Sequence, residues 1–92
     1  MIRSFRHRGV ERFFREGTKA GIQPKHARRL RLQLGRLDAA KGAEDMNLPG
    51  YDFHALKGHK PTRYSVHVNG PWCITFAFDQ AGAHDVDLEQ YH

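Results

Sequence analysis

The first part of the chain places its hydrophobic residues at the spacing of a helix. Residues 2–5 are expected to form a short strand, and a helix is predicted over residues 7–16. The apolar positions that support this helix are Val10, Phe13 and Phe14. Gly17 is a natural stop, because glycine readily takes the left-handed conformation that ends many helices.

A second helix is predicted to begin at Pro24, a residue that suits the first helical position. It carries one apolar stripe, formed by Ala27, Leu30, Leu34 and Leu37. Leu32 lies outside this stripe, and Gly35 lowers the helix propensity of the interior. The stripe is interpreted as core. Residues 41–50 contain Gly and Pro, and are interpreted as an irregular linker from the helices to a sheet.

After residue 50 the pattern changes to the alternation of strands. The apolar positions of a predicted hairpin are Tyr64, Val66, Val68, Trp72, Ile74, Phe76 and Phe78. A three-residue loop over residues 69–71 keeps one face apolar, by pairing Val68 with Trp72, Val66 with Ile74 and Tyr64 with Phe76. A last strand over residues 83–90 is expected to turn Val86 and Leu88 inward.

These elements predict one α+β domain over residues 1–92, with an N-terminal strand and two helices packed on a mostly antiparallel sheet. The sequence shows no repeat and no low-complexity run. Its single cysteine excludes an intramolecular disulfide framework. No leader is expected, because Met1-Ile2 is followed at once by Arg3. The most apolar stretch, residues 72–78, is far too short to span a bilayer. A soluble, cytosolic protein without membrane contact is therefore expected.

The charge of the chain is strongly asymmetric. Residues 1–36 hold eleven Lys and Arg against two acids, a net charge of +9. Residues 37–92 hold four Lys and Arg against eight acids, a net charge of −4, and the chain as a whole carries +5. Such an asymmetry favours an anionic partner for the first part, with nucleic acid as the leading candidate. Two solvated helix faces are the simpler explanation of the same pattern.

Three groups of residues hold the chemical types needed for metal-free RNA cleavage. The first is the outward face predicted for the hairpin, with Arg63, Ser65, His67, Cys73 and Thr75. The second is the segment of residues 54–60, and the third is the end of the chain. RNA cleavage at the 2′-hydroxyl requires a general base, a general acid and a cationic phosphate clamp. His54, Lys57, Tyr91 and His92 are candidates for these roles, although surface histidines and lysines are common.

Other chemistries find weaker support in the sequence. His54 and His59, or His84 with Asp85 and Asp87, have no spacing as specific as a paired Cys-x-x-Cys or a His-Glu-x-x-His motif. No metal or other cofactor is therefore expected. Cys73 is a poor candidate nucleophile, because His67 across the hairpin is interpreted as an ordinary strand histidine.

Several short motifs, in order and over the whole chain, resemble those of the HigB killer proteins, which are plasmid-maintenance toxins of the RelE-like superfamily. The motifs are Met1-Ile2-Arg3-Ser4-Phe5, Leu56-Lys57-Gly58, Arg63-Tyr64-Ser65-Val66, Trp72-x-Ile74-Thr75-Phe76 and Asp85-Val86-Asp87-Leu88-Glu89-x-Tyr91-His92. The resemblance implies a microbial-RNase-like fold and a type II toxin that cuts mRNA in the A site of the 70S ribosome. It also implies a helix-turn-helix antitoxin of the HigA type, through which alone operator DNA would be bound.

The functional positions of the family correspond here to His54, Lys57, Tyr91 and His92. The resemblance implies that Lys57 neutralises phosphate charge, that the histidines exchange protons and that Tyr91 orients the base or the backbone. Which histidine acts as the base stays open. RNA or ribosome contacts are expected from Lys60, Arg63, Arg28, Arg29 and Arg31.

The chain departs from the family pattern at three positions. Cys73 stands where the pattern has an arginine that binds the phosphate in the transition state, and cysteine supplies neither its charge nor its fork of donors. Gln90 stands where an acid is frequent, and His67 where a basic residue is usual. Arg63 or Lys60 is a candidate to replace the missing phosphate clamp.

Three hypotheses follow. The first is an active ribosome-dependent mRNA endoribonuclease. The second is a catalytically weakened toxin homologue that acts mainly as an antitoxin-binding module or co-repressor. The third is a small DNA- or RNA-binding protein that uses the basic helices, although residues 17–24 lack a convincing helix-turn-helix pattern.

Overall fold

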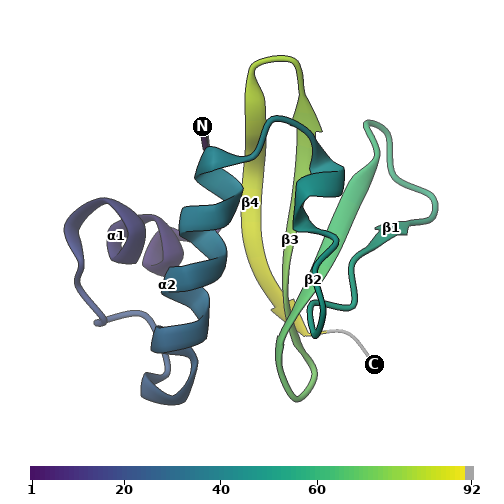
Figure 1. Cartoon of the computed structure of the whole chain (residues 1–92). Coiled ribbons are helices and arrows are strands. Elements are labelled where there is room, and N and C mark those ends of the chain that lie inside the picture. Colours follow the sequence, from purple (N-terminus) through teal and green to yellow (C-terminus); the bar gives the residue numbers. More distant parts are fainter. Residues whose placement is uncertain (91–92) are drawn as a thin grey trace.

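Both predicted helices are present in the computed structural model, which describes residues 1–90 (Figure 1). Helix α1 spans Arg8–Glu16, and the His7 side chain caps it by accepting a hydrogen bond from the Val10 backbone N–H at 3.0 Å. The helix ends at Gly17, whose φ of 79° confirms the expected stop. Helix α2 spans Pro24–Ala39, with Pro24 in its first turn as predicted.

The apolar stripe of α2 faces the core, as its spacing predicts. Ala27, Leu30, Leu34 and Leu37 are all buried, whereas Leu32 is 54% exposed. Two polar residues of α2, His26 and Gln33, are buried as well, which the apolar pattern did not indicate. The side of α2 that packs on the rest of the protein is therefore wider than the stripe alone.

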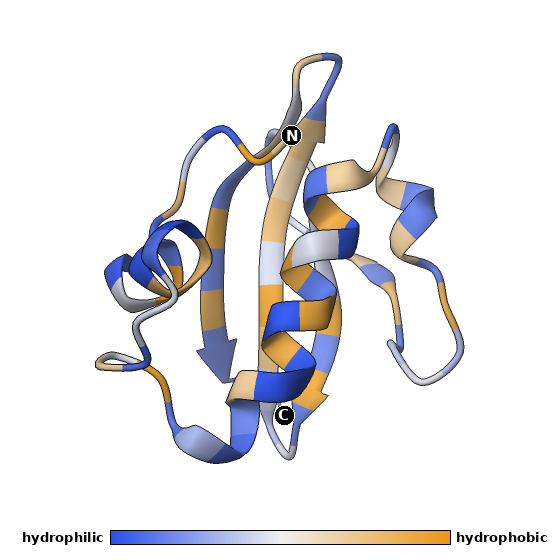
Figure 2. Ribbon diagram, turned by 60° about the vertical axis from the view of Figure 1, so that its left-hand side comes forward, coloured by the Kyte–Doolittle hydropathy of each residue, from blue (hydrophilic) through white to orange (hydrophobic). Residues whose placement is uncertain are grey.

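Four antiparallel strands form one sheet in the order β1-β2-β3-β4. Their bounds are β1 His54–Leu56, β2 Arg63–Asn69, β3 Trp72–Asp79 and β4 Gly82–Gln90. Helix α2 lies across one face of this sheet, with α1 beside it, so that the molecule has a helical layer and a sheet layer (Figures 1 and 2). This arrangement confirms the predicted α+β class.

The core lies between the two layers. The apolar residues of the strands point into it, among them Val66, Ile74, Phe76 and Val86, which are each less than 1% exposed. The alternation of hydrophobic and hydrophilic residues along β4 is plain in Figure 2. The polar residues of the strands therefore occupy the sheet face that is turned away from α2.

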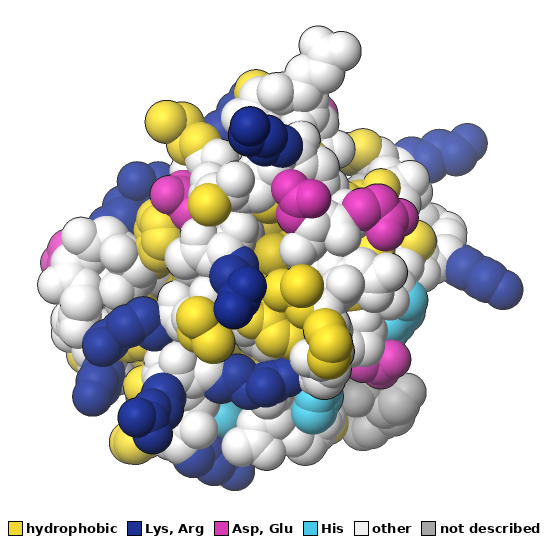
Figure 3. All heavy atoms as spheres, viewed as in Figure 1, with side chains coloured by type: hydrophobic (Ala, Val, Ile, Leu, Met, Phe, Trp, Pro, Cys, Tyr) yellow, Lys and Arg dark blue, Asp and Glu magenta, His cyan; other side chains and the backbone are white. Residues whose placement is uncertain are grey.

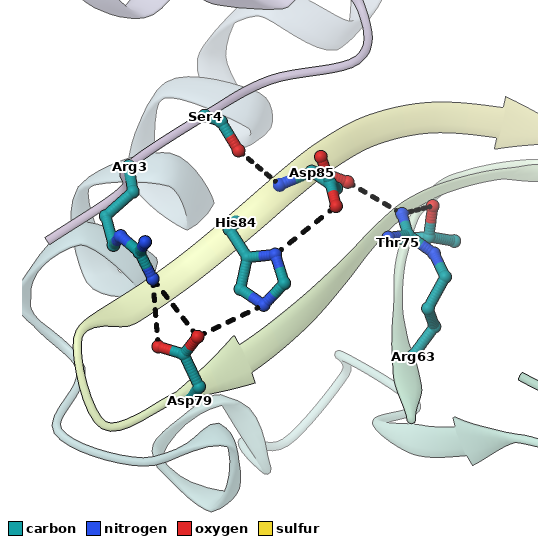
Figure 4. A network of polar contacts seen from close by, with 7 residues as sticks. All are labelled: Arg3, Ser4, Arg63, Thr75, Asp79, His84 and Asp85. Atoms are coloured by element: carbon teal, nitrogen blue, oxygen red, sulfur yellow. Dashed lines mark hydrogen bonds and ion pairs between the residues drawn. The ribbon is translucent and has the colours of Figure 1, made fainter. Parts of the chain in front are cut away.

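The N-terminal segment does not form the predicted strand over residues 2–5. It makes only two isolated parallel bridges to β4, Ile2 with Ala83 and Phe5 with Val86. Between these bridges β4 carries an extra residue, and Asp85 has a φ of 52°. The Asp85 N–H bonds to the Ser4 hydroxyl at 2.9 Å rather than to a backbone carbonyl, so this bulge interrupts the ladder (Figure 4).

The predicted hairpin register is correct for two of its three pairs. Val66 lies opposite Ile74 and Tyr64 opposite Phe76, but Trp72 pairs with Asn69 rather than with Val68. A bulge at Val68 shortens the loop and lets this side chain stay buried. The prediction of the Val68–Trp72 pair was therefore wrong.

The linker over residues 41–50 is more ordered than predicted. It contains a 3-10 helix, Ala43–Met46, and the Met46 side chain is fully buried in the core. Arg29 and Gln33 of α2 fix the end of this segment to β2. The Arg29 guanidinium donates to the Gly50 carbonyl at 2.6 Å, and the Gln33 amide donates to the His67 carbonyl at 2.8 Å.

Within residues 1–90, no helix has the length and apolar character needed to cross a bilayer.

Candidate active site

The sheet face turned away from α2 brings His54 together with the residues predicted for the outward face of the hairpin. Residues paired across neighbouring antiparallel strands point to the same side, and the same side recurs every second residue. The register therefore forms three rows on this face, which are Leu56–Arg63–Ala77, His54–Ser65–Thr75–Asp87 and His67–Cys73–Glu89. Arg63 and Cys73 thus share one face, as the sequence predicted, and the pairing of β1 with β2 puts His54 on the same face.

The His54 ring is oriented by a hydrogen bond from one of its two nitrogens. Its side chain is exposed at the start of β1, and Nδ1 lies 2.8 Å from the Asp52 carbonyl oxygen. A carbonyl oxygen accepts only, so Nδ1 carries the proton in this contact. In the neutral ring Nε2 then has a lone pair, which is the form that a general base requires.

Lys57 and Lys60 are exposed in the loop that follows β1. Gly58, between them, has a φ of 82°, which permits a tight turn directly after Lys57. Within residues 1–90, neither ammonium group is engaged in an ion pair. Both cations therefore remain available for an anionic ligand. The other two predicted catalytic residues, Tyr91 and His92, lie outside the described residues.

The hairpin face is more buried than predicted. Arg63, Ser65 and Thr75 are 4%, 1% and 0% exposed, and Cys73 is buried too. His67 is half-buried, and its Nε2 donates to the Gly70 carbonyl at 3.0 Å. The expectation that these side chains form an open outer surface was wrong, because alternation assigns a side chain to a face but does not show what covers that face.

Arg63 is held by two hydrogen bonds from one nitrogen. Its Nη2 donates to the Thr75 hydroxyl at 3.1 Å and to the Asp85 carbonyl at 2.7 Å (Figure 4). Thr75 in turn donates to the Glu89 carboxylate. Burial lowers the pKa of Arg63, the charge of Arg6 lowers it further, and the carboxylates of Glu89, Asp85 and Asp87 oppose this effect. The guanidinium nevertheless stays charged at neutral pH.

Cys73 is well separated from Arg63 along the sheet. Cys73 pairs with His67, which is four residues from Arg63 on β2, or about 13 Å at the rise of a strand. The Cys73 sulfur lies 4.0 Å from the Pro71 carbonyl oxygen and next to the Glu89 position. Any phosphate held by Arg63 would therefore lie at a different place from one held by an arginine at position 73.

The predicted contacts on α2 belong to the helical layer. Arg28 and Arg31 are exposed, and Arg31 lies over the Phe13 ring with 5.3 Å between its guanidinium carbon and the ring centre. Arg29 is half-buried in its contact with the Gly50 carbonyl. In the space-filling view, Lys and Arg side chains gather over the helices (Figure 3). The five predicted RNA-contacting residues are therefore divided between the two layers.

Sequence reasoning missed Arg6 and Glu89 as members of this region. The Arg6 N–H donates to the Val86 carbonyl at 2.7 Å, which places Arg6 beside the β4 bulge and near Arg63. Glu89 was visible in the alternation of Asp85, Asp87 and Glu89 along β4, which puts acids on the same face as Thr75. No sequence pattern predicts the position of Arg6, because the β4 bulge that brings Arg6 near Arg63 does not change the alternation of residue types.

A second polar network joins the N-terminus to the β3–β4 turn. His84 lies between two carboxylates, with 3.5 Å from its Nε2 to Asp79 and 3.3 Å from its Nδ1 to Asp85 (Figure 4). Arg3 donates to both Asp79 oxygens at 3.1 Å. Among residues 1–90, no group of three His, Cys, Asp or Glu side chains is arranged to hold a metal ion. The contacts of Arg3 and His84 with Asp79 tie the N-terminal segment and β4 to the end of β3.

The fold and the site together define a class: a two-layer α+β protein with an exposed histidine on its polar sheet face and exposed lysines in the adjoining loop. These groups are suited to acid–base cleavage of a phosphodiester. The chain belongs to the HigB family of RelE-like toxins of type II toxin–antitoxin systems, whose model matches residues 3–92. Endoribonuclease HigB of Proteus vulgaris is 33% identical over 92 residues, which cover 100% of both chains.

These findings confirm the resemblance seen in the motifs and the predicted fold class. The name of the Proteus protein agrees with the predicted activity. Membership of a type II toxin–antitoxin family also implies an antitoxin as a partner of this chain.

Proposed function

We propose that this toxin is an endoribonuclease that cleaves mRNA on the ribosome without a metal ion. The observation that carries the proposal is the contact of His54 Nδ1 with the Asp52 carbonyl, since it leaves Nε2 free to accept a proton on the face that Lys57 adjoins. The relationship to an endoribonuclease supports the same activity.

In the proposed reaction, His54 Nε2 takes the proton of the RNA 2′-hydroxyl. The 2′-oxygen then bonds to the adjacent phosphorus, and the bond from phosphorus to the 5′-oxygen breaks. Lys57 neutralises the charge that develops on the phosphate, His92 gives its proton to the leaving 5′-oxygen, and Tyr91 orients the base or the backbone. The RNA ends as a 2′,3′-cyclic phosphate and a free 5′-hydroxyl, so that atoms and protons balance.

The partners follow from the family and from the charge. Lys60 and Arg63 are proposed to contact mRNA near the site, and Arg28, Arg29 and Arg31 to contact ribosomal RNA from the helical layer. The antitoxin is proposed to be a helix-turn-helix protein of the HigA type, which alone binds operator DNA. The proposed place of action is the cytoplasm, where ribosomes and mRNA are found.

Cleavage of mRNA in a purified translation system tests this proposal. Lys57→Ala and His54→Ala should each slow cleavage at least about 100-fold, the usual effect of losing one acid–base or charge-stabilising group. Lys41→Ala serves as a matched control, because Lys41 is also an exposed lysine but lies in the segment after α2.

Two results would contradict the proposal. Equal cleavage rates of the Lys57→Ala and Lys41→Ala variants would show that Lys57 has no role in the reaction. Cleavage of the same mRNA at the same rate without ribosomes would show that the activity does not depend on translation.

A second function is favoured by one observation. Cys73 places a small uncharged side chain where the family pattern has an arginine, so the chain is also a candidate for a weakened toxin that acts through its antitoxin. Normal growth of cells that produce the folded chain without an antitoxin would favour this function over the first.

A further inference from the structure

A small pocket of about 70 Å³ lies where the β1–β2 loop meets the start of β2 and the β4 bulge. Its lining is basic, although all but one of its residues come from the acidic part of the chain. It consists of Arg6, His59, Lys60, Pro61, Arg63, Ala77 and Asp85. Three of these side chains are cations at neutral pH, and one is an acid. Arg6 belongs to neither the catalytic nor the RNA-contacting set proposed above.

Arg63 is the buried member of this pocket. Only 4% of it is exposed, and its Nη1 is buried without a hydrogen-bond partner within residues 1–90. None of the ion pairs in that range involves Arg63, since Nη2 contacts only a hydroxyl and a backbone carbonyl. A buried cation that forms no direct ion pair is costly, because it has lost its water and nearby carboxylates offset its charge only at a distance.

The acids around Arg63 are partly engaged with other groups. The Glu89 carboxylate accepts from Thr75, and the Asp85 carboxylate lies 3.3 Å from His84 Nδ1. Arg6 adds a second positive charge, because it lines the same pocket as Arg63. Burial first, and then the charge of Arg6, lowers the pKa of Arg63. An anion in the pocket would provide the unpaired Nη1 with an acceptor and reduce the repulsion between the two guanidinium groups.

We propose that this pocket binds a phosphate group of the RNA that flanks the scissile one, an inference that rests on the proposed function. The small size and charged lining of the pocket suit a single phosphate group better than a nucleobase. Arg63 pairs with Leu56, which is two residues from His54 on β1. At the rise of a strand, the row of Arg63 is therefore about 7 Å from the row of His54. The pocket therefore lies beside the reacting group, and its residues position the RNA.

Binding of a non-cleavable RNA tests the pocket without requiring cleavage. The probe is a short fluorescent RNA with 2′-O-methyl groups at every position, and its affinity for the full chain is measured by anisotropy at several salt concentrations. Arg6→Gln and Lys60→Gln should each weaken binding about threefold to tenfold, and lower the salt slope by about 0.7 for each phosphate that is no longer neutralised. Arg36→Gln is the matched control, an exposed arginine in the last turn of α2.

Competition with inorganic phosphate distinguishes an RNA phosphate from a free one. Displacement of the RNA by phosphate in the unmodified chain, and weaker displacement in Arg6→Gln, supports the proposal. Equal RNA affinity in all three variants would overturn it. It would also be overturned if phosphate bound in an Arg6-dependent way but did not compete with the RNA.

The cleavage assay separates this inference from the proposed function. Because the pocket contacts a flanking phosphate, Arg6→Gln should raise KM several-fold and leave kcat nearly unchanged, and Lys60→Gln should behave in the same way. A fall in kcat without a change in KM would place the pocket at the scissile phosphate and refute the flanking assignment. Unchanged constants in Arg6→Gln, together with normal cleavage, would refute the pocket and leave the proposed function standing.

Discussion

Cys73 lies between His67 and Glu89 on the sheet face that carries His54. Its row is two residues from the row of His54, or about 7 Å at the rise of a strand. An arginine side chain at this position is long enough to approach a phosphate beside His54. Arg63 lies on the other side of the His54 row, so the two positions would contact different parts of an RNA bound to this face.

Restoring an arginine at position 73 should therefore increase mRNA cleavage. Loss of one preorganised donor to a transition state costs about 100- to 1000-fold in rate, so we expect a gain of at least about tenfold in kcat for Cys73→Arg. Cys73→Lys tests charge without the fork of donors and should gain less. An unchanged rate in a folded Cys73→Arg protein would mean that Arg63 or Lys60 already supplies this contact.

We expect His26 to make the stability of the protein depend on pH. It is 1% exposed at the start of α2, neither ring nitrogen has a hydrogen-bond partner within residues 1–90, and the Trp72 ring centre is 5.8 Å away. Burial, and then the neighbouring charge of Lys25, lowers its pKa below the ordinary value of 6.5. The folded protein therefore binds the proton less readily than the unfolded chain does.

As the pH falls below about 6.5, the unfolded chain takes up a proton at this position before the folded protein does, so the free energy of unfolding should decrease. Above that pH both states are neutral and the contribution is complete. His26→Leu should reduce this pH dependence, as measured by urea unfolding between pH 5 and 8. His59→Gln, which changes an exposed histidine, should keep it. The same slope in His26→Leu and in the unmodified chain would contradict this explanation.

At the scale of elements, hydrophobic spacing predicted the regular parts of the fold. The 3.6-residue period located α1 and α2, and the alternation along β2 and β3 predicted two of three cross-strand pairs. Periodicity did not reveal the bulges at Val68 and Asp85, because one extra residue changes the register without changing which residue types alternate. The second bulge also limits the N-terminal segment to two isolated bridges.

The same limit applies to the candidate site. The alternation of β2 and β3 correctly assigned Arg63 and Cys73 to one face, but it did not show that both are buried. Arg29 looked like a free cation in the sequence, and its contact with the Gly50 carbonyl depends on a loop 21 residues away. Long-range contacts of this kind decide which charges remain free for a ligand.

At the scale of the whole molecule, the two layers separate two kinds of cation. The helices provide most of the basic first part of the chain, which carries +9 over residues 1–36, and the sheet layer includes most of the acidic remainder. Only a few cations, among them Lys57, Lys60 and Arg63, accompany the acids of β4. Charge on the helical layer therefore suits docking on a polyanion, and the sheet face suits chemistry at a single phosphate.

This separation predicts that docking and cleavage can be weakened independently. Replacing both Arg28 and Arg31 by Gln should reduce binding to 70S ribosomes several-fold at moderate salt, and should lower the salt slope by about one for each phosphate that these arginines neutralise. Ribosome co-sedimentation measures both effects, with a Lys19→Gln, Lys41→Gln double variant as a control of equal charge outside α2. At saturating ribosome concentration the Arg28, Arg31 variant should cleave at the normal rate, because the row of His54 lies in the other layer. Equal loss of ribosome affinity in both double variants would show that net charge, and not the surface of α2, drives docking.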